Sequence, residues 1–299
     1  MKILLLNDST HWYHFGCTAT SIALIEKVKA LGHQITTLAI SETYKIRSSP
    51  NTQKGFLSQK VFAQFVKDNP RLIRLIRAND ALVINGEGML HGLHPAPASV
   101  LYIAYIAKTY YDRHVEILNH SAYPQDAEKI DQTTEETVVY KLVYDAVDYA
   151  AIREPVSFVT LQKLGIHAVE SFDCLPIYIK DHYKAVPVVK DPRLVLIAGS
   201  AAWLQLNIPS AVRGNIDDFA DSLKNFNRYL TSLEQQGYRI KFLYGANAMP
   251  AKDDREFLEY MGKTLGKTLE VHTAASVDDW LHSIASAAML GCAAYCVKQ

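Results

Sequence analysis

Polar residues that could do chemistry recur at one kind of place in this sequence, directly after short apolar runs. Asp8 and His14 follow the apolar run 2–6, and Glu87 and His91 follow the run 81–84. Carboxylates, imidazoles and guanidinium groups can move protons or bind anionic and hydroxyl-bearing ligands. The candidate catalytic residues are Glu87, His91, Arg153 and Asp173.

The stretch Asn85-Gly86-Glu87-Gly88-Met89-Leu90-His91 sets an acid between two glycines. Glycines let the backbone approach a ligand closely. No helix with a third glycine follows, so this is not the dinucleotide-binding fingerprint. Glu87 could act as a general base or bind a hydroxyl group, and His91 could act as an acid. The alternative is a loop that only forms one wall of a ligand site.

Arg153 directly follows the apolar run 149–152 and precedes a helix start at Pro155. A guanidinium in that place suits a carboxylate or phosphate, and the alternative is an ion pair with Glu154 or another carboxylate. Asp173 could hold a ligand hydroxyl or orient Arg153. Cys174 is a poor candidate for a nucleophile, because no sequence feature supplies its base.

Small and polar residues at the other expected strand ends complete the candidate site. Gly16 opens a helix whose N–H groups suit an anion, although a glycine there could serve the turn alone. The candidate ligand-binding residues are Asp8, His14, Gly16, Asn85, Gly86, Gly88, Ser121, Gly199, Ser200 and Gly245. No metal site is expected, because Cys292 and Cys296 have no second ligand pair near them in the sequence.

Apolar runs that alternate with helical patterns predict parallel sheets. Strands are expected at residues 2–6, 34–40, 81–84, 115–118, 149–152, 168–171, 194–198, 240–244 and 269–272, with another from Met289. Helices are expected at 18–31, 71–77, 100–109, 135–147, 155–165, 217–236, 253–265 and 277–287. Ligands collect at the carboxyl ends of such strands. Glu87, His91, Ser121, Arg153 and Asp173 should therefore converge on one cleft.

At 299 residues the chain exceeds the usual size of a single core. The proline- and charge-containing stretch 180–192 has no periodicity and is typical of a linker. We therefore expect an α/β protein with two Rossmann-like domains, at 1–180 and 194–299, joined by a linker at 181–193. The sequence ends at Gln299, soon after the last strand begins, so we expect the second domain to be incomplete and prone to self-association.

The composition argues for small-molecule partners. Lys plus Arg and Asp plus Glu both number 31, which gives a formal net charge of zero and no electrostatic footprint for nucleic acid or anionic lipid. Charges interrupt the apolar stretches, the first seven residues are too short for a signal peptide, and four cysteines are too few for a disulfide framework. We expect a cytoplasmic protein without a transmembrane segment.

Taken in order, these stretches resemble the polysaccharide pyruvyl transferase family. The likeness rests on the stretch 85–91, the segment 152–157 and the Asp173 turn, and more loosely on 7–20, 199–200 and 244–245. It implies a GT-B-like fold and a transferase that moves a pyruvyl ketal from phosphoenolpyruvate, a co-substrate, to a sugar of a cell-envelope polysaccharide. No resident cofactor is implied. Arg153 would hold the anionic donor, and the glycine stretch would face the acceptor sugar.

One segment departs from that family. Its second domain carries Gly-Arg-x-His after a helix like 277–287, where this chain has Leu290-Gly291-Cys292-Ala293-Ala294. Losing a charge clamp and a proton donor costs on the order of 10² or more in rate each. Three functions therefore stay open: a pyruvyl transferase with little turnover, a GT-B-type glycosyltransferase that uses a nucleotide sugar, and a non-catalytic sugar-binding protein.

Overall fold

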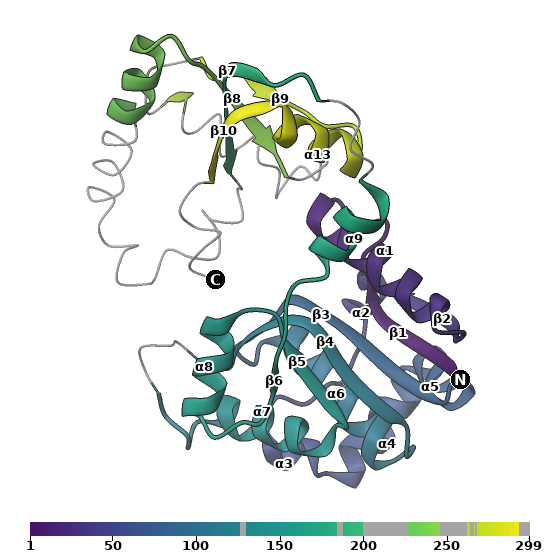
Figure 1. Cartoon of the computed structure of the whole chain (residues 1–299). Coiled ribbons are helices and arrows are strands. Elements are labelled where there is room, and N and C mark those ends of the chain that lie inside the picture. The colour runs from purple at the N-terminus through teal and green to yellow at the C-terminus, as the bar shows by residue number, and fades with distance from the viewer. Residues whose placement is uncertain are drawn as a thin grey trace. The chain divides into compact units, whose positions relative to one another are not determined.

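The computed structural model describes residues 1–125, 130–183, 188–199, 227–245, 262–263, 266 and 268–292. The chain divides into two compact units (Figure 1). The first unit contains Met1–His11 and Ala19–Tyr178, and the second contains Trp12–Thr18 and Ile179–Gln299. Each unit is built on a parallel sheet, which confirms the predicted α/β class with two Rossmann-like sheets. The domain boundaries predicted from the sequence stay a prediction.

The first unit has a six-stranded sheet in the order β2-β1-β3-β4-β5-β6. Its strands are β1 Lys2–Asp8, β2 Gln34–Ala39, β3 Ala81–His91, β4 His114–Tyr123, β5 Tyr149–Ile152 and β6 Val169–Glu170. The order reverses between β1 and β3, because β2 lies on the far side of β1. Ligands of open parallel sheets bind at such a switch point, outside the strand carboxyl ends.

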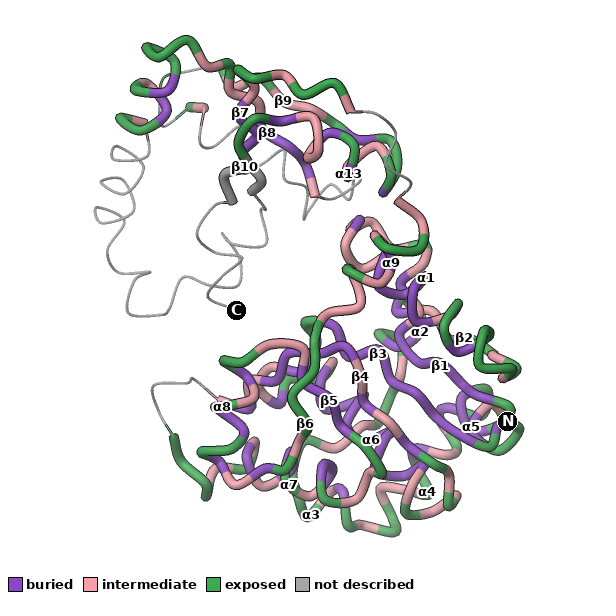
Figure 2. The backbone as a smooth tube through the Cα atoms, in the orientation of Figure 1, coloured by how far each residue is buried: buried purple, intermediate pink, exposed green. Residues whose placement is uncertain are grey.

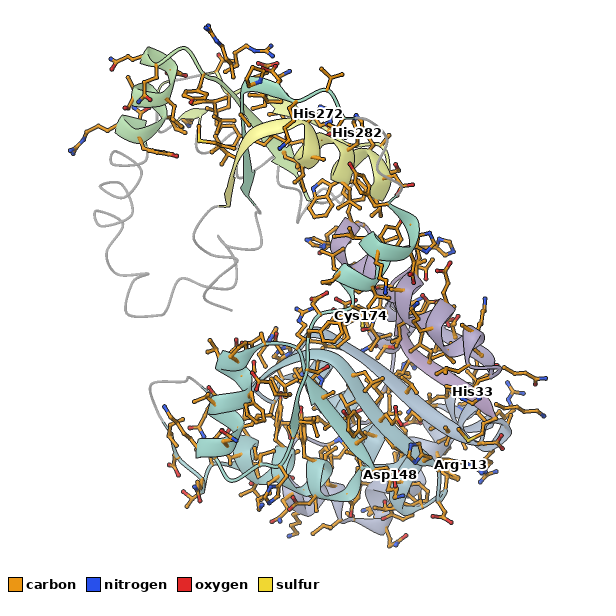
Figure 3. The ribbon with its side chains drawn as sticks, in the orientation of Figure 1. His33, Arg113, Asp148, Cys174, His272 and His282 are labelled. Carbon is orange, nitrogen blue, oxygen red and sulfur yellow. The ribbon has the colours of Figure 1, made fainter. Side chains whose placement is uncertain are left out.

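The strands of this sheet all run in one direction, so their carboxyl ends meet at one edge. Figure 3 shows Arg113 and Asp148, which precede β4 and β5, at one end of the sheet. It shows Cys174, which follows β6, at the other end. The central strands are almost entirely buried (Figure 2), as strands covered by helices must be.

Helices connect and cover these strands. They are α1 Phe15–Ala30, α2 Ile40–Thr43, α3 Gln53–Phe56, α4 Gln59–Asp68, α5 Pro70–Ala78, α6 Pro95–Thr109, α7 Glu135–Ala146 and α8 Pro155–Lys163. Helix α9, Leu175–His182, follows the last strand of this sheet. The helix α6 is buried on every side from Pro97 to Ala107, as its almost entirely apolar sequence requires. No helix in the described ranges is long and apolar enough to cross a membrane.

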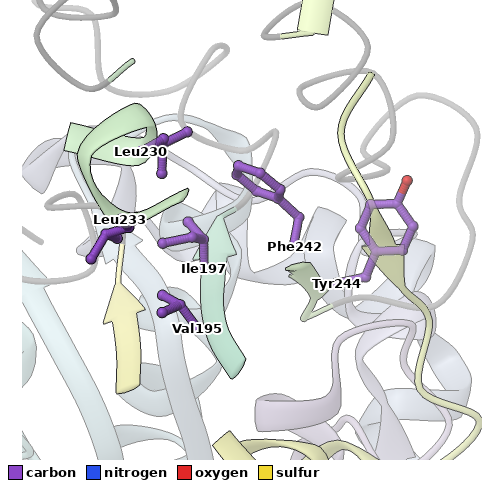
Figure 4. Packing of buried hydrophobic residues seen from close by; sticks show 6 residues of the cluster. All are labelled: Val195, Ile197, Leu230, Leu233, Phe242 and Tyr244. Carbon is purple, nitrogen blue, oxygen red and sulfur yellow. The ribbon is translucent and has the colours of Figure 1, made fainter. Parts of the chain in front are cut away.

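The second unit has a four-stranded sheet in the order β10-β7-β8-β9. Its elements include β7 Asp191–Gly199, β8 Arg239–Tyr244, β9 Val271–His272, α13 Val277–Ser286, β10 Ala287–Cys292 and the helical residues 227–235. One face of the sheet packs in a core of Val195, Ile197, Leu230, Leu233, Phe242 and Tyr244 (Figure 4). Most of the predicted helices 217–236 and 253–265 lies outside the described residues.

Strand β7 begins inside the predicted linker, at Asp191 rather than after residue 193. Asp191 pairs in register with Ala287 of β10, and its carboxylate forms an ion pair with Arg239 of β8. These neighbours extend the strand past Pro192, because contacts across a sheet decide where a strand begins as much as local propensity does.

The prediction that a glycine-containing loop follows the third strand is wrong. Strand β3 continues through Asn85–His91, and β4 continues through Asn119 to Tyr123. The register between β3 and β4 shifts between Glu87 and Leu90, and Glu87 has a φ of 49°. A bulge of this kind breaks the alternation that reveals a strand in a sequence.

Candidate functional site

Three residues with left-handed backbone lie toward the carboxyl ends of adjacent strands. Asn7 has a φ of 62° in β1, Glu87 of 49° in β3 and Asn119 of 51° in β4. Asparagine tolerates this region, whereas a glutamate there is uncommon. Residues in sparsely populated conformations persist only where the surrounding structure holds them, and they cluster at functional sites. Here they mark the switch point of the first sheet.

The Glu87 carboxylate is buried and surrounded by donors. Its Oε1 accepts hydrogen bonds from Thr20 Oγ1 at 2.6 Å, Asn85 Nδ2 at 3.0 Å and Ser9 Oγ at 3.2 Å. Its Oε2 lies 3.7 Å from Arg153 Nη1. These partners offset the cost of burying a polar group and fix the orientation of the carboxylate.

Arg153 stands between two carboxylates. Its Nη1 lies 3.0 Å from Asp173 Oδ2 and 3.7 Å from Glu87 Oε2, and its Nε donates to Ser121 Oγ at 3.3 Å. The side chain of Asp173 is 37% exposed, against 22% for Arg153 and 8% for Glu87. We call Glu87, Arg153 and Asp173 the carboxylate cluster. It presents one positive and two negative groups, and Asp173 is its most accessible member.

The structure thus brings together three predicted catalytic residues and Ser121. Gly88 belongs with them, because a Cβ added there would lie 4.0 Å from Arg153 Nη2. His91 lies further along β3, with its ring centroid 6.2 Å from that of His94. Burial, and secondarily His94, lowers the pKa of His91. In the part of the chain that the structure describes, no hydrogen bond or ion pair joins His91 to Arg153, so the predicted acid role of His91 stays a prediction.

Two of the predicted ligand-binding residues, Asp8 and Gly86, have structural roles in the first unit. Asp8 Oδ1 accepts from both the backbone N and the Oγ1 of Thr10, at 2.9 and 2.5 Å, which closes the turn after β1. A Cβ at Gly86 would lie 2.5 Å from the Cβ of His120, closer than real Cβ contacts allow. Gly86 is therefore required for the close approach of β3 and β4.

The remaining candidates belong to segments of the second unit. His14 Cε1 would lie 3.2 Å from a Cβ added at Gly16. The carbonyl of Gly245 accepts a hydrogen bond from the backbone N of Phe15 at 3.0 Å. Gly199 ends β7 and pairs in register with Tyr244, and Ser200 lies outside the described residues. Their ligand-binding roles stay predictions.

Two residues that support the cluster have partners that the sequence alone does not predict. Asn119 donates from Nδ2 to Asn85 Oδ1 at 2.9 Å and accepts at Oδ1 from the backbone N of Cys174 at 3.1 Å. Thr20 is buried in α1. The signal in the sequence was a polar residue that interrupts the apolar pattern of this helix. For Asn119 the sequence signal is the same as for Ser121, since both follow the predicted strand 115–118.

Two groups near the cluster, buried His120 and half-buried Cys174, are suited to structural roles. Burial, reinforced by Arg153, lowers the pKa of His120 to about 3, so its ring is neutral and pairs with Tyr144 Oη at 2.7 Å. Burial raises the pKa of the Cys174 thiol to about 11, with the carboxylates of Asp173 and Glu87 acting in the same direction. A thiol kept protonated is a poor nucleophile.

No model of a protein family matches this sequence, and no curated protein matches it either. Solved structures do show a similar fold. A UDP-N-acetylglucosamine 2-epimerase from Rickettsia bellii matches with a TM-score of 0.53 at 12% identity, over 98% of this chain and 74% of its own. A UDP-GlcNAc 2-epimerase from Methanocaldococcus jannaschii matches with a TM-score of 0.53 at 13% identity, over 98% and 78%.

These similarities concern the fold, since the sequences are so different. They match the two parallel sheets of this chain and support the GT-B-like architecture that the resemblance implied. They do not support the pyruvyl transferase family specifically, so pyruvyl transfer does not follow from the fold.

Proposed function

We propose that this chain is a saccharide-processing enzyme whose first unit binds sugar hydroxyl groups at the carboxylate cluster. The observation that carries this proposal is the arrangement of one guanidinium between two carboxylates at the carboxyl-terminal edge of the first sheet. Carboxylate oxygens accept hydrogen bonds from hydroxyl groups, and an exposed carboxylate can also take a proton from one. Asp173 is the candidate general base, because it is the most exposed of the three.

The charge of the cluster argues against an anion clamp at Arg153. Its Nη1 already has two carboxylates as neighbours, so an incoming phosphate or carboxylate would meet negative charge as well as positive. Like charges in a site of low dielectric repel strongly. The cluster suits the neutral, hydroxyl-bearing part of a substrate better than its anionic part.

A nucleotide sugar is the first candidate donor. The proteins of similar fold are named for the epimerisation of UDP-N-acetylglucosamine, and their similarity extends over 98% of this chain. A sugar carried on a nucleotide presents hydroxyl groups for the cluster and an anionic group that must be held elsewhere. Epimerisation and glycosyl transfer are both compatible with this substrate class.

Pyruvyl transfer from phosphoenolpyruvate is the second candidate. The observation that favours it is the order of the stretch 85–91, the Arg153 segment and the Asp173 turn, which resembles the pyruvyl transferase family. In this reaction the cluster would bind the acceptor sugar, and Asp173 would take the proton of the attacking hydroxyl. A binding protein without turnover would use the same contacts.

The test separates these candidates by substrate. The purified chain is titrated with UDP-N-acetylglucosamine and with phosphoenolpyruvate plus candidate sugars, and NMR follows UDP release, epimer formation or phosphate release. Asp173→Asn should weaken sugar binding by about tenfold, since hydrogen bonds to charged groups contribute about 1.5–3 kcal/mol. The matched control is Asp148→Asn, at the opposite end of the sheet. An affinity for the sugar that is unchanged in Asp173→Asn would refute the proposal.

A further inference from the structure

We propose that Asn119 is a positioning residue that fixes Asp173 relative to Glu87 across the carboxylate cluster. Its consequence for sugar binding rests on the proposed function, whereas its geometry does not. Asn119 lies in β4, between β3, which carries Glu87, and β5, after which Arg153 follows.

The first half of the argument is a line of side-chain amides from Glu87 to the Asp173 turn. Asn85 Nδ2 donates to Glu87 Oε1 at 3.0 Å, and Asn85 Oδ1 accepts from Asn119 Nδ2 at 2.9 Å. Asn119 Oδ1 then accepts from the backbone N of Cys174 at 3.1 Å. Each amide uses its donor on one neighbour and its acceptor on the other.

The second half closes this line into a ring. Asp173 directly precedes Cys174, and its Oδ2 lies 3.0 Å from Arg153 Nη1, which in turn lies 3.7 Å from Glu87 Oε2. The other Asp173 oxygen, Oδ1, accepts from the backbone N of Leu175 at 2.7 Å. The two carboxylates are therefore joined on one side by Arg153 and on the other by two amides. We call this the amide ring.

Asparagine is the residue type that position 119 requires. Its φ of 51° disfavours most side chains, while asparagine, aspartate and glycine tolerate it. Asparagine also supplies a donor group, Nδ2, and an acceptor, Oδ1, and both are used. The residue is only 3% exposed, so water does not replace these bonds.

Holding Asp173 in place has a chemical consequence. A catalytic or binding constellation works only when its groups stay within about 0.5 Å of the productive arrangement. The turn at Asp173 is the most exposed part of the cluster and lies on a connection between β6 and α9, not on a strand. The bond from Cys174 N to Asn119 anchors this connection to the buried centre of the sheet.

The reaction rate of the Cys174 thiol can report whether the bond from Cys174 N to Asn119 Oδ1 is in place. The residue is half-buried, and burial and the nearby carboxylates raise the pKa of its thiol to about 11. If the bond to its backbone N is lost, the turn should open more often and the thiol should react faster. This readout depends on the turn and not on any enzymatic activity.

The experiment compares alkylation of Cys174 by iodoacetamide at pH 8, followed by peptide mass spectrometry, in the full chain. Asn119→Gly keeps the left-handed backbone but removes both bonds, and the rate at Cys174 should rise about tenfold. Cys17 in the same sample serves as the internal reference.

The control is Asn79→Gly, which removes another buried asparagine, one whose Nδ2 donates to Leu75 O away from the ring. An unchanged rate at Cys174 in Asn119→Gly, or an equal rise in Asn79→Gly, would overturn the positioning role. If the thiol rate rises but sugar binding stays at the wild-type level, the positioning role stands and the proposed function fails.

Discussion

Gly86 and Gly88 flank the same carboxylate in different surroundings. Gly86 is buried, and a Cβ there would lie 2.5 Å from the Cβ of His120. Gly88 is exposed, and a Cβ there would meet only Arg153 Nη2, at 4.0 Å. One glycine therefore serves the packing of two strands, while the other leaves room above the guanidinium.

Alanine substitutions should separate these roles. Gly86→Ala should lower the free energy of unfolding by about 1–3 kcal/mol, because β3 and β4 must move apart to admit the methyl group. Gly88→Ala should change it by less than about 1 kcal/mol, because the contact is an ordinary one. Urea unfolding followed by circular dichroism measures both. Equal losses in the two variants would contradict this account.

His120 predicts a pH dependence of stability. Its pKa in the folded chain is about 3, against the usual value of 6.5, because burial and then Arg153 disfavour the charged ring. Below pH 6.5 the unfolded chain takes up a proton that the folded chain refuses. The free energy of unfolding therefore falls as pH is lowered from 7 toward 3, by at most about 1.4 kcal/mol per pH unit from this group.

The variant His120→Gln tests this, because glutamine can keep a hydrogen bond to Tyr144 without titrating. Between pH 7 and pH 5 the variant should lose less stability than the wild type in urea unfolding. Burial also lowers the pKa of His91 and His94, which contribute in the same direction to both proteins. An identical pH slope in the two proteins would exclude His120 as a source of the effect.

At this scale the sequence was informative about some residues and silent about others. Glu87, Arg153 and Asp173 were found because each follows a predicted strand, and parallel strands end at one edge. Asn119 follows a predicted strand, but its supporting role was not predicted, and Thr20 was missed, because the partners of both depend on register. Asn119 meets Asn85 and Cys174 only once β3, β4 and the turn after β6 are in place.

Among the elements, helix α8 is tied to β4 by its cap. Glu154 precedes the helix, and its carboxylate accepts from the backbone N of Val156 at 2.8 Å and of Ser157 at 3.0 Å. It also accepts from Tyr123 Oη, at the end of β4, at 2.8 Å. Because Arg153 immediately precedes this cap, the same local structure fixes the start of α8 and the backbone of Arg153.

Removing the cap should cost stability. Glu154→Ala should lower the free energy of unfolding by about 1–2 kcal/mol, since several donors lose their acceptor at once. Glu154→Gln, which keeps a side-chain oxygen, should recover part of the loss. Thermal and urea unfolding provide the measurement, with Ser58→Ala, the single-bond cap of α4, as a comparison. A loss at Ser58 as large as that at Glu154 would argue against the multiple contacts.

The strands differ in how well the sequence predicts their bounds. Strand β5 was expected at 149–152 and lies at Tyr149–Ile152, because charged residues border it on both sides. Strand β3 was expected to stop at residue 84, yet it continues to His91 through the bulge at Glu87. The end of β3 contains polar residues. From the sequence alone, such residues predict a loop.

For the whole molecule, each unit has a hydrophobic core of its own. The core of the first unit includes the buried strands β1 and β3, while that of the second includes Val195, Ile197 and Phe242 (Figure 4). The segments of the first unit contain no tryptophan, whereas Trp12 and Trp280 belong to the second. Tryptophan fluorescence therefore reports on the second unit, and circular dichroism reports on both.

Phe242→Ala should destabilise the second unit selectively. The ring is 2% exposed, and replacing a buried phenylalanine by alanine costs about 3–5 kcal/mol through lost burial and the cavity left behind. In urea, the fluorescence transition should move to lower concentration, while part of the circular dichroism change stays at its wild-type midpoint. The matched variant Ile84→Ala, at a fully buried position of β3, should move only the circular dichroism transition. If either substitution shifts both signals together, the two cores unfold as one cooperative body, because separate cores can show separate transitions only when little free energy couples them.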